Sequence, residues 1–126
     1  MRKPLTEALV FPSTEPTISV ADDKEYGGAH EYIIQNCFGF NNGKTEYGAS
    51  RQTIQFVHKK EDGNITPGLQ SEQLVLMLID RHRKLNARFP SPQNEKMIAG
   101  LQQFIDACKE RVQDRIDRGV MGDLKK

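Results

Sequence analysis

The stretch SEQLVLMLIDRHRKLNARFPSPQN, residues 71–94, decides the fold because the spacing of apolar residues changes there. Leu74, Leu78 and Leu85 recur at intervals of four and seven residues, which is the spacing of one helical face. The prolines of PSP cannot continue a helix. The stretch therefore predicts one long helix that begins with Ser71 as its N-cap and ends at PSP.

A second helical pattern starts directly after PSP and runs from about residue 93 to residue 118, with Gly119 as a typical stop. Its apolar stripe consists of Met97, Leu101, Phe104, Ile105, Cys108, Val112 and Ile116. Because the connection between the two patterns is short, we expect the helices to pack as an antiparallel hairpin.

The residues before this hairpin alternate with the period of a strand. In the strand expected over residues 30–40, one side should carry Tyr32, Ile34 and Phe38, and the other Ile33 and Cys37. Turn signals follow at residues 42–43 (Asn-Gly) and 62–63 (Asp-Gly). We expect an antiparallel β meander over residues 29–70, after an irregular arm (1–28) with one short strand in PTISVAD.

These patterns predict an α+β fold in a single domain, residues 1–126: an N-terminal antiparallel β-sheet followed by a C-terminal antiparallel two-helix hairpin, 71–126. The apolar stripe is more than so small a sheet can cover. We therefore expect the helical hairpin to mediate dimerisation.

Composition and charge restrict the class of protein. The chain has 126 residues, no apolar run near the ~20 residues of a membrane span, and no apolar N-terminal segment typical of export. We therefore expect a cytoplasmic protein without a membrane partner. Residues 1–80 carry seven Lys or Arg against eleven Asp or Glu (−4), and residues 81–126 carry eleven against six (+5). An anionic partner should meet the C-terminal third.

Signals of catalysis are missing from the sequence. His30, His58 and His82 lack the close spacing of a metal site, and no phosphate-binding or nucleophile motif is present. We expect a binding protein rather than an enzyme, with no catalytic residue, metal or cofactor.

The stretch RVQDRIDRG, residues 111–119, places three arginines on the flank of the second helix. Arg111, Arg115 and Arg118 follow at intervals of four and three residues. One interpretation is a solvated flank in which Asp114 pairs with Arg118 or Arg111. The other is a pair of guanidinium groups, Arg111 and Arg115, that holds phosphate oxygens, with Arg118 as a helix-end charge.

The turn between the helices offers two further candidates. Phe89 is either a core residue or an exposed platform on which a base could stack. Asn94 is either an N-cap or a reader of a base edge. Asn94 and Arg111 lie ~25 Å apart along one helix, so they can share a ligand only if a second, antiparallel copy brings its arginines to this turn.

Several segments resemble a known family. IQF before a glycine hairpin, GLQSEQLVLMLIDRH, RFPSPQN and CKERVQDRIDRGVMG are similar to the phage anti-Thoeris sponge family, Thoeris anti-defence protein one. The resemblance covers about residues 29–126. The C-terminal region of that family belongs to a wider domain shared with phage anti-CBASS sponges.

The resemblance implies a phage protein, active in the cytoplasm of the infected bacterium, that sequesters a signal made by bacterial TIR-domain enzymes without cleaving it. That signal is a cyclic ADP-ribose isomer, glyco-cyclic ADP-ribose. The resemblance also implies a homodimer or homohexamer, and a separate site for cyclic oligonucleotides in some members.

The resemblance also implies which residues contact the ligand. The asparagine of the family matches Asn94, and its two arginines match Arg111 and Arg115. Its aromatic residue falls near Leu85, and Phe89, one turn later, is our substitute for the stacking platform.

Two alternatives remain. A nucleic-acid-binding protein would use the basic C-terminal third, but acidic residues interleaved with the arginines disfavour it. A purely oligomerising interaction protein would use the helical hairpin alone.

Overall fold

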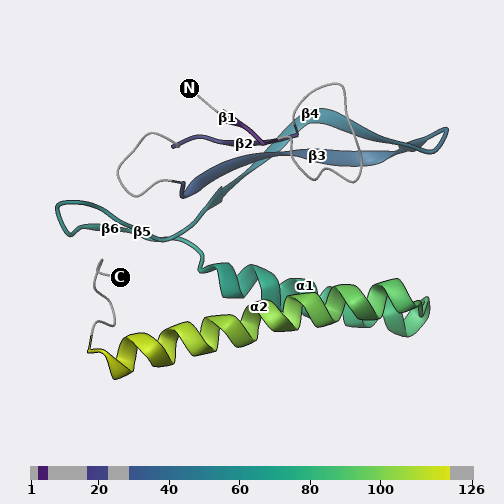
Figure 1. Ribbon diagram of the computed structural model, residues 1–126. Helices are drawn as coiled ribbons and strands as arrows, with labels where there is room; N and C mark the ends of the chain where they lie inside the picture. The colour runs from purple at the N-terminus through teal and green to yellow at the C-terminus, as the bar shows by residue number, and fades with distance from the viewer. Residues whose placement is uncertain (1–2, 6–16, 23–28, 120–126) are drawn as a thin grey trace. The chain divides into compact units, whose positions relative to one another are not determined.

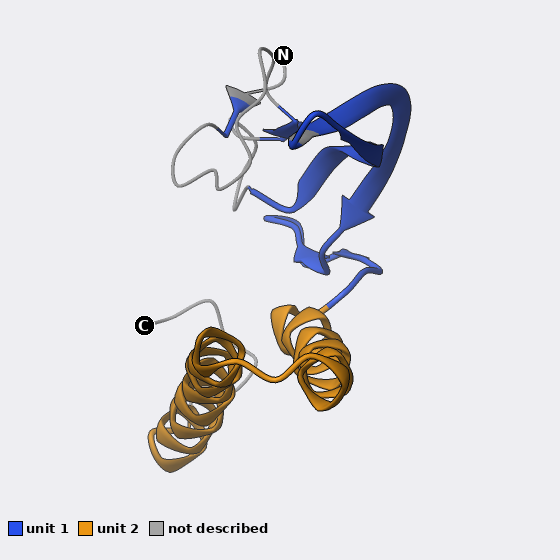
Figure 2. Cartoon of the chain, turned by 90° about the vertical axis from the view of Figure 1, so that its right-hand side faces the viewer, with its two compact units in different colours: residues 1–69 blue, residues 70–126 orange. Residues whose placement is uncertain are grey.

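The expected α+β class is confirmed. A computed structural model describes residues 3–5, 17–22 and 29–119, and within them an antiparallel sheet precedes two packed helices (Figure 1). The chain divides into two compact units, Met1–Leu69 and Gln70–Lys126, which we call the sheet unit and the helical unit (Figure 2). That both act as one domain stays a prediction, as does dimerisation, and most of the expected arm lies outside the described residues.

The sheet unit contains a four-stranded antiparallel sheet. Its strands are β1 (Lys3–Pro4), β2 (Ile18–Val20), β3 (Glu31–Asn41) and β4 (Lys44–Gln55), and they lie side by side in this order. The short strand expected in PTISVAD is β2. Asn42 and Gly43 connect β3 to β4 with positive φ angles of 51° and 75°. These angles are those of a tight hairpin turn, which confirms the Asn-Gly signal.

The pairing of β3 with β4 is irregular in its second half. The register shifts between Gln35 and Cys37 and again between Cys37 and Gly39. Such bulges leave residues unpaired and interrupt the alternation of faces. Phe38, which we expected beside Tyr32 and Ile34, is exposed, whereas those two side chains are half-buried. The expected alternation is therefore wrong beyond Gln35.

A second, two-stranded sheet follows β4. It pairs β5 (His58–Lys59) with β6 (Ile65–Thr66) in antiparallel register. The turn between them contains Gly63 at a φ of 89°, and the Asp62 side chain accepts a hydrogen bond from the Asn64 backbone N–H at 2.9 Å. This hairpin, β5–β6, confirms the Asp-Gly turn signal.

After β6 the chain returns to the end of β4. The Val57 N–H donates to the Leu69 carbonyl oxygen at 2.9 Å, and the Leu69 N–H donates to the Gln55 oxygen at 2.8 Å. Gly68 passes so close that a Cβ there would lie 2.5 Å from the carbonyl carbon of Phe56. Only glycine fits at this position without a shift of the backbone.

The helical unit consists of α1 (Ser71–Arg88) and α2 (Pro92–Asp117). The N-cap of α1 is Gln70 and not Ser71, because the backbone of Gln70 is extended (φ −96°, ψ 144°) and Ser71 is already helical. The Gln73 side chain accepts a hydrogen bond from the Gln70 backbone N–H at 2.8 Å, as in a capping box. Gly119, at a φ of 70°, follows the C-cap of α2, as expected.

The two helices run antiparallel and pack against each other (Figure 1). Ile79 of α1 is 4% exposed and Ile105 of α2 is 6% exposed, and these are the buried apolar residues of the described helices. Neither helix carries an apolar stretch long enough to cross a membrane, in the part of the chain that the structure describes.

Candidate functional site

The turn between the helices is fixed by polar side chains at both of its ends. Ser91 is the N-cap of α2, and its Oγ accepts a hydrogen bond from the Asn94 backbone N–H at 3.0 Å. Pro92 follows at the first helical position, where its missing N–H is not needed. The Asn86 side chain of α1 accepts from the Ser91 backbone N–H at 3.1 Å. These hydrogen bonds fix the backbone of the turn and the position of Asn94 beside it.

Asn94 is not the N-cap, since Ser91 holds that position directly before Pro92. The Asn94 side chain instead bridges the turn, because its Nδ2 donates to the Phe89 carbonyl oxygen at 3.0 Å. An amide has two N–H groups and an oxygen. One N–H and the oxygen have no partner among the described residues, and these are the groups that could read a base edge.

Phe89 is exposed, which excludes the core interpretation within the described chain. It caps the C-terminus of α1, where its backbone N–H donates to the Leu85 carbonyl oxygen at 2.9 Å, and it is 73% exposed. Leu85 itself is half-buried one turn earlier. Of the two positions, only Phe89 presents an aromatic face on which a base could stack.

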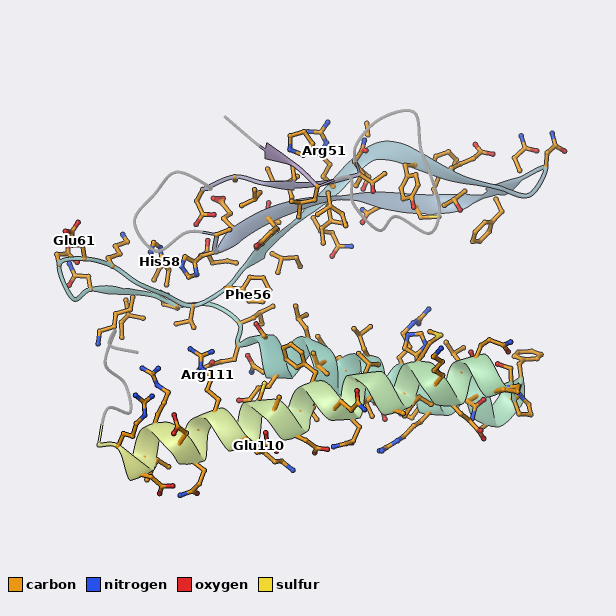
Figure 3. The ribbon with its side chains drawn as sticks, viewed as in Figure 1. Arg51, Phe56, His58, Glu61, Glu110 and Arg111 are labelled. Atoms are coloured by element: carbon orange, nitrogen blue, oxygen red, sulfur yellow. The ribbon has the colours of Figure 1, made fainter. Side chains whose placement is uncertain are left out.

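The arginines lie at the opposite end of α2. Arg111, labelled beside Glu110 in Figure 3, is exposed, and Arg115 is half-buried. Arg118 bonds to Asp114, since its Nε and Nη2 both lie 3.0 Å from the same carboxylate oxygen. This confirms Asp114 and Arg118 as a pair. Arg111 and Arg115 lie one helical turn apart on α2. At this spacing one phosphate group could contact both guanidinium groups.

The arginine end of α2 extends past α1 (Figure 1). Helix α2 has 26 residues and α1 has 18, so the last eight residues of α2, 110–117, lie beyond the start of α1, a length of ~12 Å. Val112 and Ile116 belong to this segment, which we call the α2 overhang, and both are exposed. The apolar stripe expected along α2 is therefore exposed at its C-terminal end, as it also is at Met97 and Phe104.

A single chain does not bring the candidate residues together. Asn94 and Arg111 are 17 positions apart on one continuous helix, which corresponds to ~25 Å. Phe89 and Leu85 lie at the Asn94 end, and Arg115 lies at the Arg111 end. The two halves of the candidate site are each present, but they are separated by the length of α2.

The sequence interpretation missed one cluster, in the sheet unit. The rings of His30 and His58 are stacked with centroids 4.1 Å apart and an angle of 16° between their planes. Because Glu31 pairs with Gln55, His30 lies opposite Phe56, whose N–H donates to the His30 carbonyl oxygen at 2.7 Å, and His58 follows two residues later. Only the register of β3 and β4 brings the two histidines together, and residue spacing gives no signal of it.

Asp22 holds the backbone beside the histidine pair. Its carboxylate accepts hydrogen bonds from the backbone N–H groups of His30, at 2.8 and 2.9 Å, and of Glu31, at 3.0 Å. Burial acts to raise the pKa of Asp22, but these backbone donors outweigh it and lower the pKa below its ordinary value. Asp22 is therefore a buried, ionised group at neutral pH.

Burial lowers the pKa of His30 below its ordinary value, and the nearby His58 lowers it further, while the Asp22 carboxylate acts in the opposite direction. The pair does not suggest a metal centre, because two stacked imidazoles cannot both point a nitrogen at one ion. Within the residues that the structure describes, no group of three or more His, Cys, Asp or Glu side chains could hold a metal ion.

Comparison with known proteins gives no family assignment. The chain matches no protein-family model, and no curated protein is significantly similar to it.

Proposed function

We propose that the protein binds and sequesters a cyclic ADP-ribose isomer, glyco-cyclic ADP-ribose, made by bacterial TIR-domain defence enzymes, as a member of the phage anti-Thoeris sponge family. The observation that carries this proposal is the α2 overhang. It places Arg111 and Arg115 one turn apart beside two uncovered apolar side chains, Val112 and Ile116. Exposed apolar groups can be covered by a second subunit, and arginines beside them can hold phosphate oxygens, so this surface would suit a site that a second subunit completes.

Each half of the site supplies a different part of nucleotide recognition. The exposed ring of Phe89 offers a stacking face for adenine, with Leu85 one turn behind it, and Asn94 offers a donor and an acceptor for the base edge. Arg111 and Arg115 would neutralise the pyrophosphate. Binding of this kind needs no nucleophile or general base, and we propose that the ligand is held without turnover.

The two halves can meet only between copies of the chain. In a two-fold symmetric dimer with antiparallel α2 helices, the overhang of one copy reaches the turn of the other. The assembly is then a homodimer, or a homohexamer built from dimers, in the cytoplasm of the infected bacterium. Cyclic oligonucleotides would bind at a separate site of the larger assembly, for which we assign no residue.

Calorimetry with a panel of cyclic ADP-ribose isomers and cyclic oligonucleotides tests the proposal. We expect one or more isomers to bind, and Arg111→Ala to weaken binding about tenfold to a hundredfold, because a charge-assisted hydrogen bond is lost. Arg83→Ala is the matched control, since Arg83 is an exposed arginine on α1 and should leave affinity unchanged. No heat with any cyclic ADP-ribose isomer would contradict the proposal.

Mixed dimers test whether the site is shared. Phe89→Ala and Arg111→Ala chains should each bind only weakly alone, but co-refolding them restores one intact, high-affinity site in every heterodimer. A random mixture should then bind about a quarter of the wild-type amount of ligand. No recovery on mixing would show that both residues act within one chain or not at all.

Two further measurements distinguish a sequestering protein from an enzyme and from a nucleic-acid-binding protein. Heating the complex should release intact ligand, whereas a hydrolysed product would indicate an enzyme. Duplex DNA that competes for the same arginines with a steep salt slope would indicate a nucleic-acid-binding protein instead.

A further inference from the structure

We propose that Asn86 is a positioning residue for the nucleotide site. Its side chain closes a ring of hydrogen bonds that holds Phe89 and Asn94 in one arrangement before the ligand binds. The inference rests on the proposed function, in which Phe89 and Asn94 contact the base. Asn86 acts through the turn between the helices and not through a contact of its own with the ligand.

Two links of the ring join the end of α1 to Asn94. The Phe89 backbone N–H donates to the Leu85 carbonyl oxygen at 2.9 Å. The Phe89 carbonyl oxygen accepts from Nδ2 of Asn94 at 3.0 Å. The peptide groups on both sides of Phe89 are therefore held, one by the backbone of α1 and the other by a side chain of α2.

The other two links return from Asn94 to α1. The Asn94 backbone N–H donates to Oγ of Ser91 at 3.0 Å, and the Ser91 backbone N–H donates to Oδ1 of Asn86 at 3.1 Å. Asn86 directly follows Leu85 in the last turn of α1, so it closes the ring. Asn86 and Ser91 are both half-buried, and water therefore competes less for the bond between them than it would on an open surface.

The closed ring couples the two proposed base contacts. Because Nδ2 of Asn94 is bound to the backbone of Phe89, a base that stacks on the Phe89 ring meets the Asn94 amide in a defined direction. A site that is ordered before binding avoids the entropy cost of ordering it afterwards.

Loss of the Asn86 side chain should open this ring. The Ser91 N–H would lose its protein acceptor, and conformations in which the turn is open would become populated. The apparent affinity for a ligand falls in proportion to the fraction of chains in the binding-competent conformation.

Calorimetry of the full-length chain with glyco-cyclic ADP-ribose tests the proposal. Asn86→Ala should weaken binding by about threefold to tenfold, the range expected when one neutral hydrogen bond no longer holds the competent conformation. Gln102→Ala is the matched control. It removes another half-buried amide, whose Nε2 donates to Asp106 at 3.2 Å within α2, and should leave the affinity unchanged.

A double-mutant cycle separates positioning from a general loss of stability. In Asn94→Ala the ring is already open, because the link to the Phe89 carbonyl oxygen is gone. Asn86→Ala should then weaken the remaining binding much less than it does in the wild type. An equal weakening in both backgrounds, or an unchanged affinity of Asn86→Ala, would overturn the proposal.

Hydrogen exchange of the chain without ligand tests the ring separately from the proposed function. In Asn86→Ala, the protection factor of the Asn94 backbone amide, which bonds to Ser91, should fall by about threefold to tenfold. The Ile105 amide in the middle of α2 should keep its protection if the helices stay folded. A wild type that binds no cyclic ADP-ribose isomer would contradict the proposed function, whereas unchanged protection of Asn94 would overturn the positioning role of Asn86.

Discussion

The sheet unit and the helical unit bury different kinds of side chain. Among the described residues, the sheet unit buries Thr17, Asp22 and His58 but only one apolar side chain, Val20. The helical unit buries two, Ile79 and Ile105, and both are apolar. The sheet unit therefore depends on directed polar contacts and backbone geometry, whereas the helical unit depends on apolar packing that continues onto an uncovered surface.

This difference has a consequence for assembly. Exposed apolar residues are spread along both helices: Leu76, Met77, Leu78, Phe89, Met97, Phe104, Val112 and Ile116. A pair of helices that leaves so much apolar surface exposed gains stability when a partner covers it. The described part of the sheet unit leaves fewer large apolar side chains exposed, namely Leu5, Phe38, Phe40 and Ile65, so we expect it to gain less from a partner.

The largest expected effect is the loss of the buried isoleucine of α2. Ile105→Ala should lower the free energy of unfolding by about 2–5 kcal/mol, because it removes a buried side chain and leaves a cavity. Urea unfolding of the full chain measures the change. The control is Phe104→Ala at the next residue, which is 44% exposed and should cost about 1 kcal/mol or less in an isolated chain.

The same pair of variants tests the assembly. If a second copy covers Phe104, Phe104→Ala will cost nearly as much as Ile105→Ala, and the wild-type midpoint will rise with protein concentration. A small cost for Ile105→Ala would contradict the view that the helices are held by apolar packing.

The next effect concerns the replacement of glycine by alanine, which should destabilise the sheet unit but stabilise the helical unit. Gly68→Ala should destabilise the protein by about 1–3 kcal/mol, because the new Cβ would lie 2.5 Å from the backbone of Phe56. Gly100→Ala, in α2 with nothing within 4 Å of the new Cβ, should stabilise it by about 0.5–1 kcal/mol through helix propensity. Thermal unfolding of both variants measures the difference. If both substitutions changed the stability in the same direction, this distinction between the units would be wrong.

The smallest effect concerns the turn of the helical unit, which is polar although the unit is mainly apolar. Ser91→Ala should cost about 1 kcal/mol, since the Asn94 N–H loses its acceptor. Ser91→Asp restores an N-cap acceptor and should recover most of the loss. Helix content and unfolding midpoint measured by circular dichroism distinguish the two variants, and no difference between them would show that the cap contributes nothing.

Local rules explain what the sequence could predict. The Asn42–Gly43 turn, the end of α1 before Pro90 and the stop at Gly119 each follow from the backbone preferences of one or two residues. The bulges near Cys37 and the histidine pair could not be predicted, because both depend on the register between strands that are distant in the sequence.

The candidate site divides in the same way. Periodicity and capping rules placed Asn94 beside the turn and Arg111 at the far end of a long helix, where the structure has them. The exposure of Phe89 needed the structure, since the same sequence is compatible with a core phenylalanine. The turn and the arginines can form one site only if a second copy of the chain brings them together, and the sequence pattern of one chain does not specify that contact.

The return of the chain to β4 after hairpin β5–β6 also bears on how the protein can be altered. The hairpin leaves at Val57 and re-enters at Leu69, and these two residues are joined by a backbone hydrogen bond of 2.9 Å. Its ends are thus held together independently of its length, and the entropy of loop closure grows only slowly with added residues. Natural variation or protein engineering could therefore exchange this hairpin for a longer loop or a peptide tag, while the point at which the chain enters α1 stays the same.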